Sequence, residues 1–515
     1  MEETALEGLS GRQRPWFEAR HLGGEVHTQG TPHCHLGHRL DSGHRHGPDG
    51  VFAQWDWDGH RLVVCNDRYG IHPLFYACHG GMIRVSPSIF QVLDGDIPRT
   101  LDDTALAVFL RLGFFIGEST PFECVHVLPP GSTLTWQDGV CSLERGDPSV
   151  PAPDPPVASF DEAVERYIAL FRQAIARRPP PEAGFTLPIS GGRDSRHILF
   201  ELLTQGHPPA GTVTVQSRPP SANEDLRIAR ILAAELGLEN VQIAMPRDYF
   251  AASRKDIELT QLCGSGHTWL LPVAAWLQAH GVQTLYDGLA GSVLSGGFQV
   301  NEEKLALARA GHTRKLATRL LRENGLQPFL SQALRPPMDR RLDEAPAMEA
   351  VAAELERHVD APHPLMSFIF WNRTRRGISL IPFSILGSVE TVYCPYLDHD
   401  LFDFLFHLDA GYSMGNALHD EALRRGYPQY AHLPFEDPSA PKAPMSAESA
   451  HYRRAVRGFL AEFARHPGRL GSRMVRSERI LAMLTRDLLR PRCPRTWYLQ
   501  PALYLLELEA CLEAD

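Results

Sequence analysis

The sequence lacks an excess of basic residues, since 61 aspartates and glutamates outnumber 51 lysines and arginines and give a formal net charge of −10. At the level of the whole chain, nothing therefore indicates nucleic-acid binding. The chain also lacks an uninterrupted apolar run long enough to cross a bilayer, and the acidic segment 1–7 has no apolar core. We expect no nucleic-acid partner, no membrane span and no signal peptide.

Cysteine is scarce as well, because nine cysteines are scattered over 515 residues without a Cys-x-x-Cys pair. This spacing excludes a dense disulfide framework and the common cysteine-based zinc sites. We therefore expect reduced thiols and a cytoplasmic location. The histidine-rich segment 21–46 could hold a metal ion, but we interpret it as a polar loop, because its histidines lack separate placement on helices or strands.

The most informative segment that is present reads Ser190-Gly-Gly-Arg-Asp-Ser195. The β-prone run 185–189 precedes it and apolar residues at helical spacing follow it, which predicts a strand, a tight glycine turn and the start of a helix. The backbone N–H groups of such a turn and the helix dipole favour an anion. Asp194 beside a polyphosphate requires a cation such as Mg²⁺ between the two. The alternative is an ordinary turn with serine as the helix N-cap.

A proline-rich stretch at 148–156 divides the chain and predicts a domain at residues 1–147, a linker at 148–158 and a second domain at 159–515. Short strands that form hairpins around Asp58-Gly59, Gly80-Gly81 and Asp138-Gly139 indicate that the first domain is an antiparallel β-sandwich. Its expected elements are strands at 50–59, 61–65, 73–77 and 82–86, two strands within 127–140, and a helix at 104–112.

In the second domain, helices alternate with strands, which predicts an α/β fold with a parallel sheet. Ligands of such sheets bind beyond the carboxyl ends of the strands, where the turn at 189–195 would lie. The expected helices are 160–177, 196–204 and 225–236, the expected strands are 185–189, 211–215, 240–243 and 284–287, and the chain beyond 300 is expected to be helical.

Several segments, in order along the chain, resemble the asparagine synthetase family. Segment 190–195 is no Walker loop, because no Gly-Lys-Ser/Thr follows it, and is similar to the pyrophosphate loop of the N-type ATP pyrophosphatases. The other similar segments are 66–76, 223–229, 286–298 and 394–399. The resemblance implies a mixed α+β and α/β architecture. A degenerate Ntn-type, glutaminase-like β-sandwich domain would precede an ATP pyrophosphatase synthetase domain, similar to adenine nucleotide alpha hydrolases, with a helical C-terminal part.

Departures from the family pattern change the expected activity. Position 2 holds Glu2 and the first cysteine is Cys34, so the resemblance implies a chain without the family's N-terminal thiol nucleophile and without glutaminase activity. In this it looks like β-lactam synthetase, carbapenam synthetase and the lasso-peptide cyclases. Ser292 and Val293 stand where the family has two acids, and Leu289 stands where it has an acid–base group. A pseudoenzyme scaffold is therefore an alternative.

The resemblance assigns roles to residues around the glycine turn. The turn would bind the β- and γ-phosphates of ATP, and Asp194 and Asp287 would bind Mg²⁺. Three residues would act in catalysis: Asp194, Arg193 as a phosphate clamp, and Lys442, which would neutralise charge as pyrophosphate leaves. The residues expected to bind ATP are Ile189, Ser190, Gly191, Gly192, Asp194, Ser195, Val215, Asp287 and Gly288.

We expect a two-step ligase that uses ATP and Mg²⁺. A substrate carboxylate attacks ATP and releases pyrophosphate, and an amine then attacks the acyl adenylate to form an amide and AMP. The expected glutaminase loss favours an intramolecular cyclase of the macrolactam or β-lactam type. An intermolecular amide ligase and an asparagine synthase-like use of free ammonia are the alternatives.

The expected substrate is a small molecule or peptide that carries a carboxylate and an amine. One of Arg373, Arg375 and Arg376 could reach that carboxylate. A precursor peptide or a protease is a further partner that the resemblance implies. The arginine-rich tail at 453–495 could contact an acidic partner, although such residues are commonly solvated on helix faces.

Overall fold

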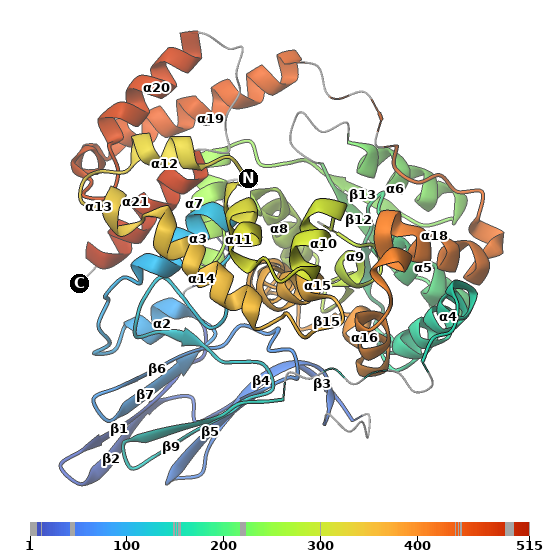
Figure 1. Ribbon diagram of the computed structural model, residues 1–515, viewed down its shortest axis with the longest axis horizontal. Helices are drawn as coiled ribbons and strands as arrows, with labels where there is room; N and C mark the ends of the chain where they lie inside the picture. Colours follow the sequence, from blue (N-terminus) through green and yellow to red (C-terminus); the bar gives the residue numbers. More distant parts are fainter. Residues whose placement is uncertain are drawn as a thin grey trace.

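A computed structural model describes residues 8–11, 13–41, 47–147, 150, 152, 156–216, 223–298, 300–437, 439–440, 442, 445–489 and 499–513. A β-sandwich lies at one end of the molecule, and a parallel sheet with surrounding helices forms the rest (Figure 1). In that view the helices α19 (Met445–Arg465) and α20 (Ser477–Leu489) lie at the opposite end from the sandwich.

The sandwich consists of two five-stranded antiparallel sheets. Its core contains Trp55 and Trp136, both at most 1% exposed. The predicted hairpins around Asp58-Gly59, Gly80-Gly81 and Asp138-Gly139 are confirmed. The first sheet has the order β2 (Glu25–Gly30), β1 (Phe17–Leu22), β7 (Met82–Ser86), β6 (Phe75–His79), β8 (His126–Val127), and the second has the order β10 (Val140–Glu144), β9 (Thr133–Gln137), β5 (Arg61–Asn66), β4 (Asp49–Trp57), β3 (His33–Leu40).

The polar loop expected at 21–46 is wrong over the residues that the structure describes there, because they contain the end of β1 and all of β2 and β3. Both β2 and β3 lie at sheet edges, where no residue of either strand is fully buried, and their polar sequences give only a weak strand signal. Their backbone groups pair with β1 and β4. Within the described ranges, no group of three or more His, Cys, Asp or Glu side chains could hold a metal ion.

A disulfide joins Cys78 of β6 to Cys141 of β10 and so links the two sheets. The expectation of reduced thiols is wrong for this pair. The two cysteines are 63 residues apart, and only the stacking of the sheets brings them together. The structure describes six other cysteines as free thiols.

The predicted linker is described only at residues 150, 152 and 156–158, which form neither helix nor strand; the rest of 148–158 lies outside the described residues. After it, Ser159 caps the predicted helix α4 (Phe160–Ala176) by accepting a hydrogen bond from the N–H of Glu162 at 3.2 Å. This confirms the start of the second half of the chain as a helix.

The second half contains a five-stranded parallel sheet, as predicted. Its order is β13 (Asn240–Ile243), β12 (Gly211–Val215), β11 (Thr186–Pro188), β14 (Thr284–Tyr286), β15 (Thr391–Tyr393). Strand β15 was not predicted, because three residues after a long helical region give no strand signal. Since β11 and β14 are neighbours, the segments that follow them, 189–195 and 287–292, meet at one edge of the sheet.

The other elements are helical, with the following bounds. In and after the sandwich lie α2 (Ile89–Leu93) and α3 (Asp103–Leu112); around the parallel sheet lie α5 (Asp194–Thr204), α6 (Glu224–Glu235), α7 (Tyr249–Leu259), η1 (Thr268–Leu270), α8 (Leu271–Ala279) and α9 (Gly291–Leu294). Beyond 300 lie α10 (Glu302–Arg309), α11 (Thr313–Arg322), α12 (Gln327–Ala333), α13 (Met338–Arg341), α14 (Glu344–Glu356), α15 (Pro364–Phe368), the π-helices η2 (Ile369–Ile378) and η3 (Ile381–Ile385), η4 (Pro395–Leu397), α16 (His399–Phe406), α17 (Ala410–Ser413), η5 (Met414–Asn416), α18 (Ala417–Gly426), η6 (Pro428–Tyr430), η7 (Pro467–Gly471) and α21 (Leu499–Glu513). Among the described residues, no helix is both long and apolar enough to cross a membrane.

Ion pairs fix the sandwich against the second half. Arg178, which follows α4, contacts the carboxylates of Asp49 in β4 at 2.7 Å and Asp398 before α16 at 3.0 Å. All three side chains are at most 1% exposed. Arg68 pairs with Asp403 of α16 at 2.6 Å. The parallel sheet and the sandwich are therefore held together by desolvated charges.

Candidate functional site

A cavity of about 390 Å³ lies at the carboxyl ends of β11, β12 and β14. Residues 188–195, 213–215 and 286–293 contribute to its walls, as the parallel-sheet rule predicts. Every residue predicted to bind ATP, except Gly191, lines this cavity. The predicted residues therefore lie together around one cavity, and their binding of ATP stays a prediction.

The glycine turn is held by its own two serines. The Oγ of Ser195 accepts a hydrogen bond from the N–H of Ser190 at 3.2 Å, and the two hydroxyls lie 3.3 Å apart. The Oγ of Ser190 accepts from the N–H of Gly192 at 3.1 Å. The turn leads into helix α5, which begins at Asp194 and directs the positive end of its dipole at the cavity.

A carboxylate already occupies part of this anion-binding turn. Asp225, in the first turn of α6, accepts a hydrogen bond from the N–H of Gly191 at 2.7 Å. The charge of Asp225 also acts on a neighbouring carboxyl group, because burial and this charge together raise the pKa of Glu436. The sequence placed Asp225 only within a similar segment and gave it no role. The available signal was an acidic residue in the first turn of α6, the helix that follows strand β12.

Asp194 and Asp287 lie half-buried on neighbouring loops. Desolvation, and to a smaller extent the charge of Asp287, raise the pKa of Asp194 to about 7. Burial likewise raises the pKa of Asp287 to about 6. The carboxylates also accept backbone hydrogen bonds, Asp194 from Ser292 at 2.9 Å and Asp287 from Leu289 at 2.8 Å. Two carboxylates beside an anion-binding turn fit a divalent cation that completes its coordination with phosphate oxygens and water.

Glycines permit the close approach of the second loop to Asp194. A Cβ on Gly288 would lie 2.6 Å from the Cβ of Asp194, and a Cβ on Gly291 would lie 2.6 Å from its Cγ. Gly288 was predicted as a nucleotide contact, and the structure gives it this second function. Gly291 was not singled out.

A histidine behind Asp194 was also missed. The Nδ1 of His419 lies 3.6 Å from the Oδ1 of Asp194 and 2.9 Å from the Oγ of Ser295. Burial, and next the charge of Arg193, lower the pKa of His419 to about 3. His419 is therefore neutral at physiological pH and positions the loop around Asp194 without adding charge.

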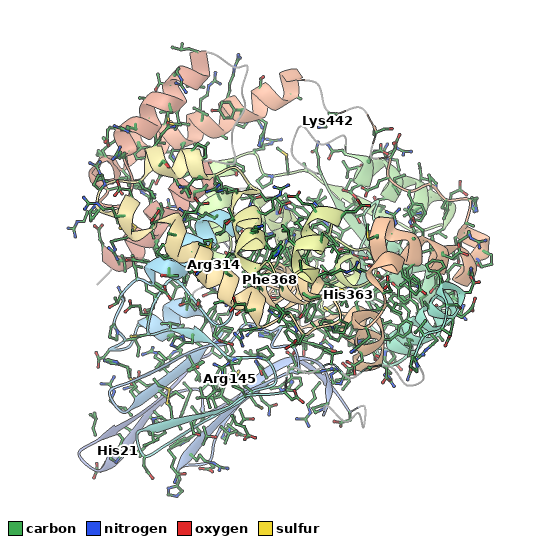
Figure 2. All side chains as sticks on the ribbon, in the orientation of Figure 1. His21, Arg145, Arg314, His363, Phe368 and Lys442 are labelled. Carbon is green, nitrogen blue, oxygen red and sulfur yellow. A yellow bond between two sulfur atoms is a disulfide. The ribbon has the colours of Figure 1, made fainter. Side chains whose placement is uncertain are left out.

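Arg193 lines the cavity, but its charge is already neutralised. Its Nη2 donates to Asp420 at 2.9 Å, and its guanidinium lies 4.8 Å from the ring centre of Phe435. Lys442 is exposed on the loop before α19 and does not line the cavity (Figure 2). The structure thus does not bring Lys442 to the other predicted residues, and its catalytic role stays a prediction.

Three arginines of η2 differ in what they contact. Arg375 donates to the carbonyls of Gly70 at 3.2 Å and Leu128 at 2.9 Å. Arg376 donates to the carbonyl of Gly117 at 2.6 Å. Both therefore support the contact with the sandwich. The third, at position 373, lines the cavity.

Two family models match separate parts of the chain. Residues 46–145 match the model of a glutamine amidotransferase domain, and residues 166–513 match the asparagine synthase model. The chain is 28% identical over 164 residues to asparagine synthetase [glutamine-hydrolyzing] 3 of Bacillus subtilis (strain 168), which covers 30% of this chain and 25% of that protein.

Two fungal proteins match a longer part. Amidase chry2 of Gibberella zeae is 24% identical over 275 residues, 48% of this chain and 39% of its own length. Amidase chyE of Penicillium rubens is 25% identical over 265 residues, 46% of this chain and 38% of its own length. The chain thus spans well under half the length of these relatives. Because the asparagine synthase model covers more than half of the chain, the chain belongs to the asparagine synthase family.

Proposed function

We propose that this chain is an ATP-dependent carbon–nitrogen ligase. A substrate carboxylate attacks the α-phosphorus of ATP, the bond to the β-phosphate breaks, and pyrophosphate leaves. An amine nitrogen then attacks the acyl carbon, the bond to AMP breaks, and the amine proton passes to water. The observation that carries the proposal is the glycine turn. Its Gly191 N–H already donates to an anionic group, the carboxylate of Asp225, and Asp194 lines the same cavity.

The residues of the chain supply position and charge. The N-terminal turn of α5 offers backbone N–H groups to the leaving phosphates, which displace Asp225 from Gly191. Bound Mg²⁺, held by Asp194 and Asp287, would neutralise phosphate charge and polarise the α-phosphorus. The buried, neutral His419 fixes the adjacent loop through its hydrogen bond with Ser295.

We further propose that the chain has no glutaminase activity of its own. Burial raises the pKa of Cys34 to about 11 and also raises that of Cys65, so both thiols stay protonated at neutral pH and are poor nucleophiles. Cys78 of the same domain is bonded to Cys141. The amine would then come from the substrate, as in an intramolecular cyclase of the macrolactam or β-lactam type.

Two other candidate functions remain. An intermolecular amide ligase, or an enzyme that takes free ammonia, would use the same activation step with a separate amine. A scaffold without catalysis is favoured by the apolar side chains of Leu289 and Val293, which line the cavity where the family has polar groups.

A precursor peptide or a protease is the proposed partner of the cyclase. The six free thiols within the described residues support the proposed cytoplasmic location, and the Cys78–Cys141 bond weighs against it.

The test is a product analysis with the full chain. Incubation with Mg²⁺, ATP and candidate acids that carry an amine is expected to yield AMP and pyrophosphate. Asp194→Asn is expected to abolish this, and Asp360→Asn, at an exposed position outside the cavity, is the matched control. ADP and phosphate as products would contradict the proposal. Tight ATP binding without any AMP would favour the scaffold.

A further inference from the structure

The cavity has a second wall that the nucleotide site does not explain. It is built from the π-helices η2 and η3, and long π-helices are rare and concentrate at functional sites. Arg373 and Thr374 of η2 line the cavity together with Ile378, Ile381 and Leu386. A cation and a hydroxyl therefore stand in an otherwise apolar surface.

Arg373 has no carboxylate partner among the described residues. Burial lowers its pKa to about 10, and its ring neighbour is Phe298, whose centre lies 4.6 Å from the guanidinium carbon. Of the described residues that line the cavity, only Arg193 and Arg373 carry a permanent positive charge, and Arg193 is paired with Asp420. An unpaired guanidinium in apolar surroundings is costly, and a ligand carboxylate would relieve that cost.

The neighbouring hydroxyl points to the same conclusion. The Oγ1 of Thr374 is buried and finds no hydrogen-bond partner within the described part of the chain, and the residue is only 1% exposed. Buried hydroxyls nearly always have a partner. A group that enters the cavity could accept hydrogen bonds from Thr374 and Arg373 together.

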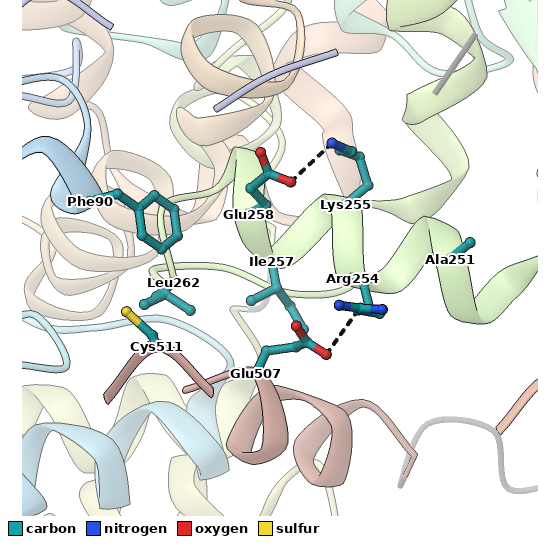
Figure 3. A pocket seen from close by; sticks show the side chains of 9 residues that line it. All are labelled: Phe90, Ala251, Arg254, Lys255, Ile257, Glu258, Leu262, Glu507 and Cys511. Carbon is teal, nitrogen blue, oxygen red and sulfur yellow. Dashed lines mark hydrogen bonds and ion pairs between the residues drawn. The ribbon is translucent and has the colours of Figure 1, made fainter. Parts of the chain in front are cut away.

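A second cavity, of about 290 Å³, serves as a comparison because its wall has no unpaired charged side chain among the residues drawn (Figure 3). It lies between α7 and α21, and its charged side chains are already paired. Arg254 contacts Glu507 at 3.0 Å, and Lys255 contacts Glu258 at 2.9 Å. Those pairs leave no charge for a ligand, in contrast to Arg373.

We propose that Arg373 and Thr374 bind the carboxylate that is activated, and that the substrate is a monocarboxylic acid with an apolar body next to this carboxylate. The apolar body would lie on Ile378, Ile381 and Leu386. A second carboxylate, as in aspartate, would find no unpaired cation in the described cavity wall. This inference rests on the proposed function for the reaction, but the binding it describes can be measured without turnover.

The test is equilibrium dialysis of the full chain with labelled octanoate. We expect wild type to bind octanoate at least about tenfold tighter than octanamide, the range that a charge-assisted hydrogen-bonded pair supplies. Arg373→Gln is expected to lose about that factor, and Arg373→Lys to recover only part of the affinity, because lysine keeps the charge but lacks the planar guanidinium fork that stacks on Phe298. Arg314→Gln, which removes an exposed arginine that pairs with Glu349 (Figure 2), is expected to change nothing.

Three results would overturn the inference. Octanoate could bind Arg373→Gln as tightly as wild type, wild type could bind octanamide or aspartate as tightly as octanoate, or Arg373→Gln could weaken ATP binding and spare octanoate. The comparison of octanoate with octanamide needs only wild type, so a variant that fails to fold does not remove the test. If octanoate binding depends on Arg373 while no acid yields AMP, the binding site stands and the proposed reaction falls.

Discussion

The half-buried carboxyl of Asp194 is expected to lower the stability of the fold while it serves ligand binding. Its pKa of about 7 in the folded chain lies above the ordinary 3.8, so the folded state binds a proton that the unfolded state has lost between these values. Stability therefore falls as pH rises from about 4 to 7 and levels off above 7. The full penalty is about 4 kcal/mol above pH 7 and about 2 kcal/mol at pH 5.

Asp194→Asn removes this ionisation and keeps an oxygen to accept the N–H of Ser292. We expect urea denaturation to show a variant that is more stable than wild type at both pH values, with a gain about 2 kcal/mol larger at pH 8 than at pH 5. The same variant is expected to lose Mg²⁺–ATP affinity. Asp360→Asn is the control for both measurements. A gain that does not grow with pH, or a variant less stable than wild type at pH 8, would refute the reasoning.

Three further predictions follow from the same geometry. Mg²⁺–ATP is expected to bind more tightly at pH 8 than at pH 6 and to release protons, because it favours the ionised form of the two raised carboxyls; titration calorimetry in buffers of different ionisation enthalpy measures this. Asp225→Asn is expected to bind Mg²⁺-free pyrophosphate about tenfold more tightly, since a like charge leaves the N–H of Gly191, and unchanged affinity in calorimetry would contradict it. Arg178→Met is expected to lower the unfolding free energy by about 3–5 kcal/mol, because Asp49 and Asp398 stay buried without their partner; a melting temperature equal to that of wild type would contradict it.

Local patterns in the sequence were sufficient for much of the fold. The turn at 190–195 and strands β11, β12 and β14 combine β-prone runs, glycines and helical spacing within a few residues, so neighbours in the sequence determine them. The rule that ligands bind at strand carboxyl ends then indicated the turn that holds Asp194, and the family resemblance added Asp287, which lines the same cavity.

The remaining features depend on contacts between distant segments. Asp225 reaches the N–H of Gly191 only because β12 lies beside β11, and His419 reaches Asp194 across 225 positions. The edge strand β3 was missed for a related reason, since its pairing with strand β4 holds it in place. The sequence could not tell Arg373 from Arg375, because only the folded chain shows that Arg375 bonds to the sandwich while Arg373 lines the cavity.

The most direct test of the nucleotide site is a crystal structure of the chain with Mg²⁺ and α,β-methylene ATP, which cannot be cleaved between these phosphates. We predict that a phosphate oxygen replaces the carboxylate of Asp225 on the N–H of Gly191, and that Asp194 and Asp287 both ligate Mg²⁺. Density for nucleotide elsewhere, with Asp225 still on Gly191, would contradict the account.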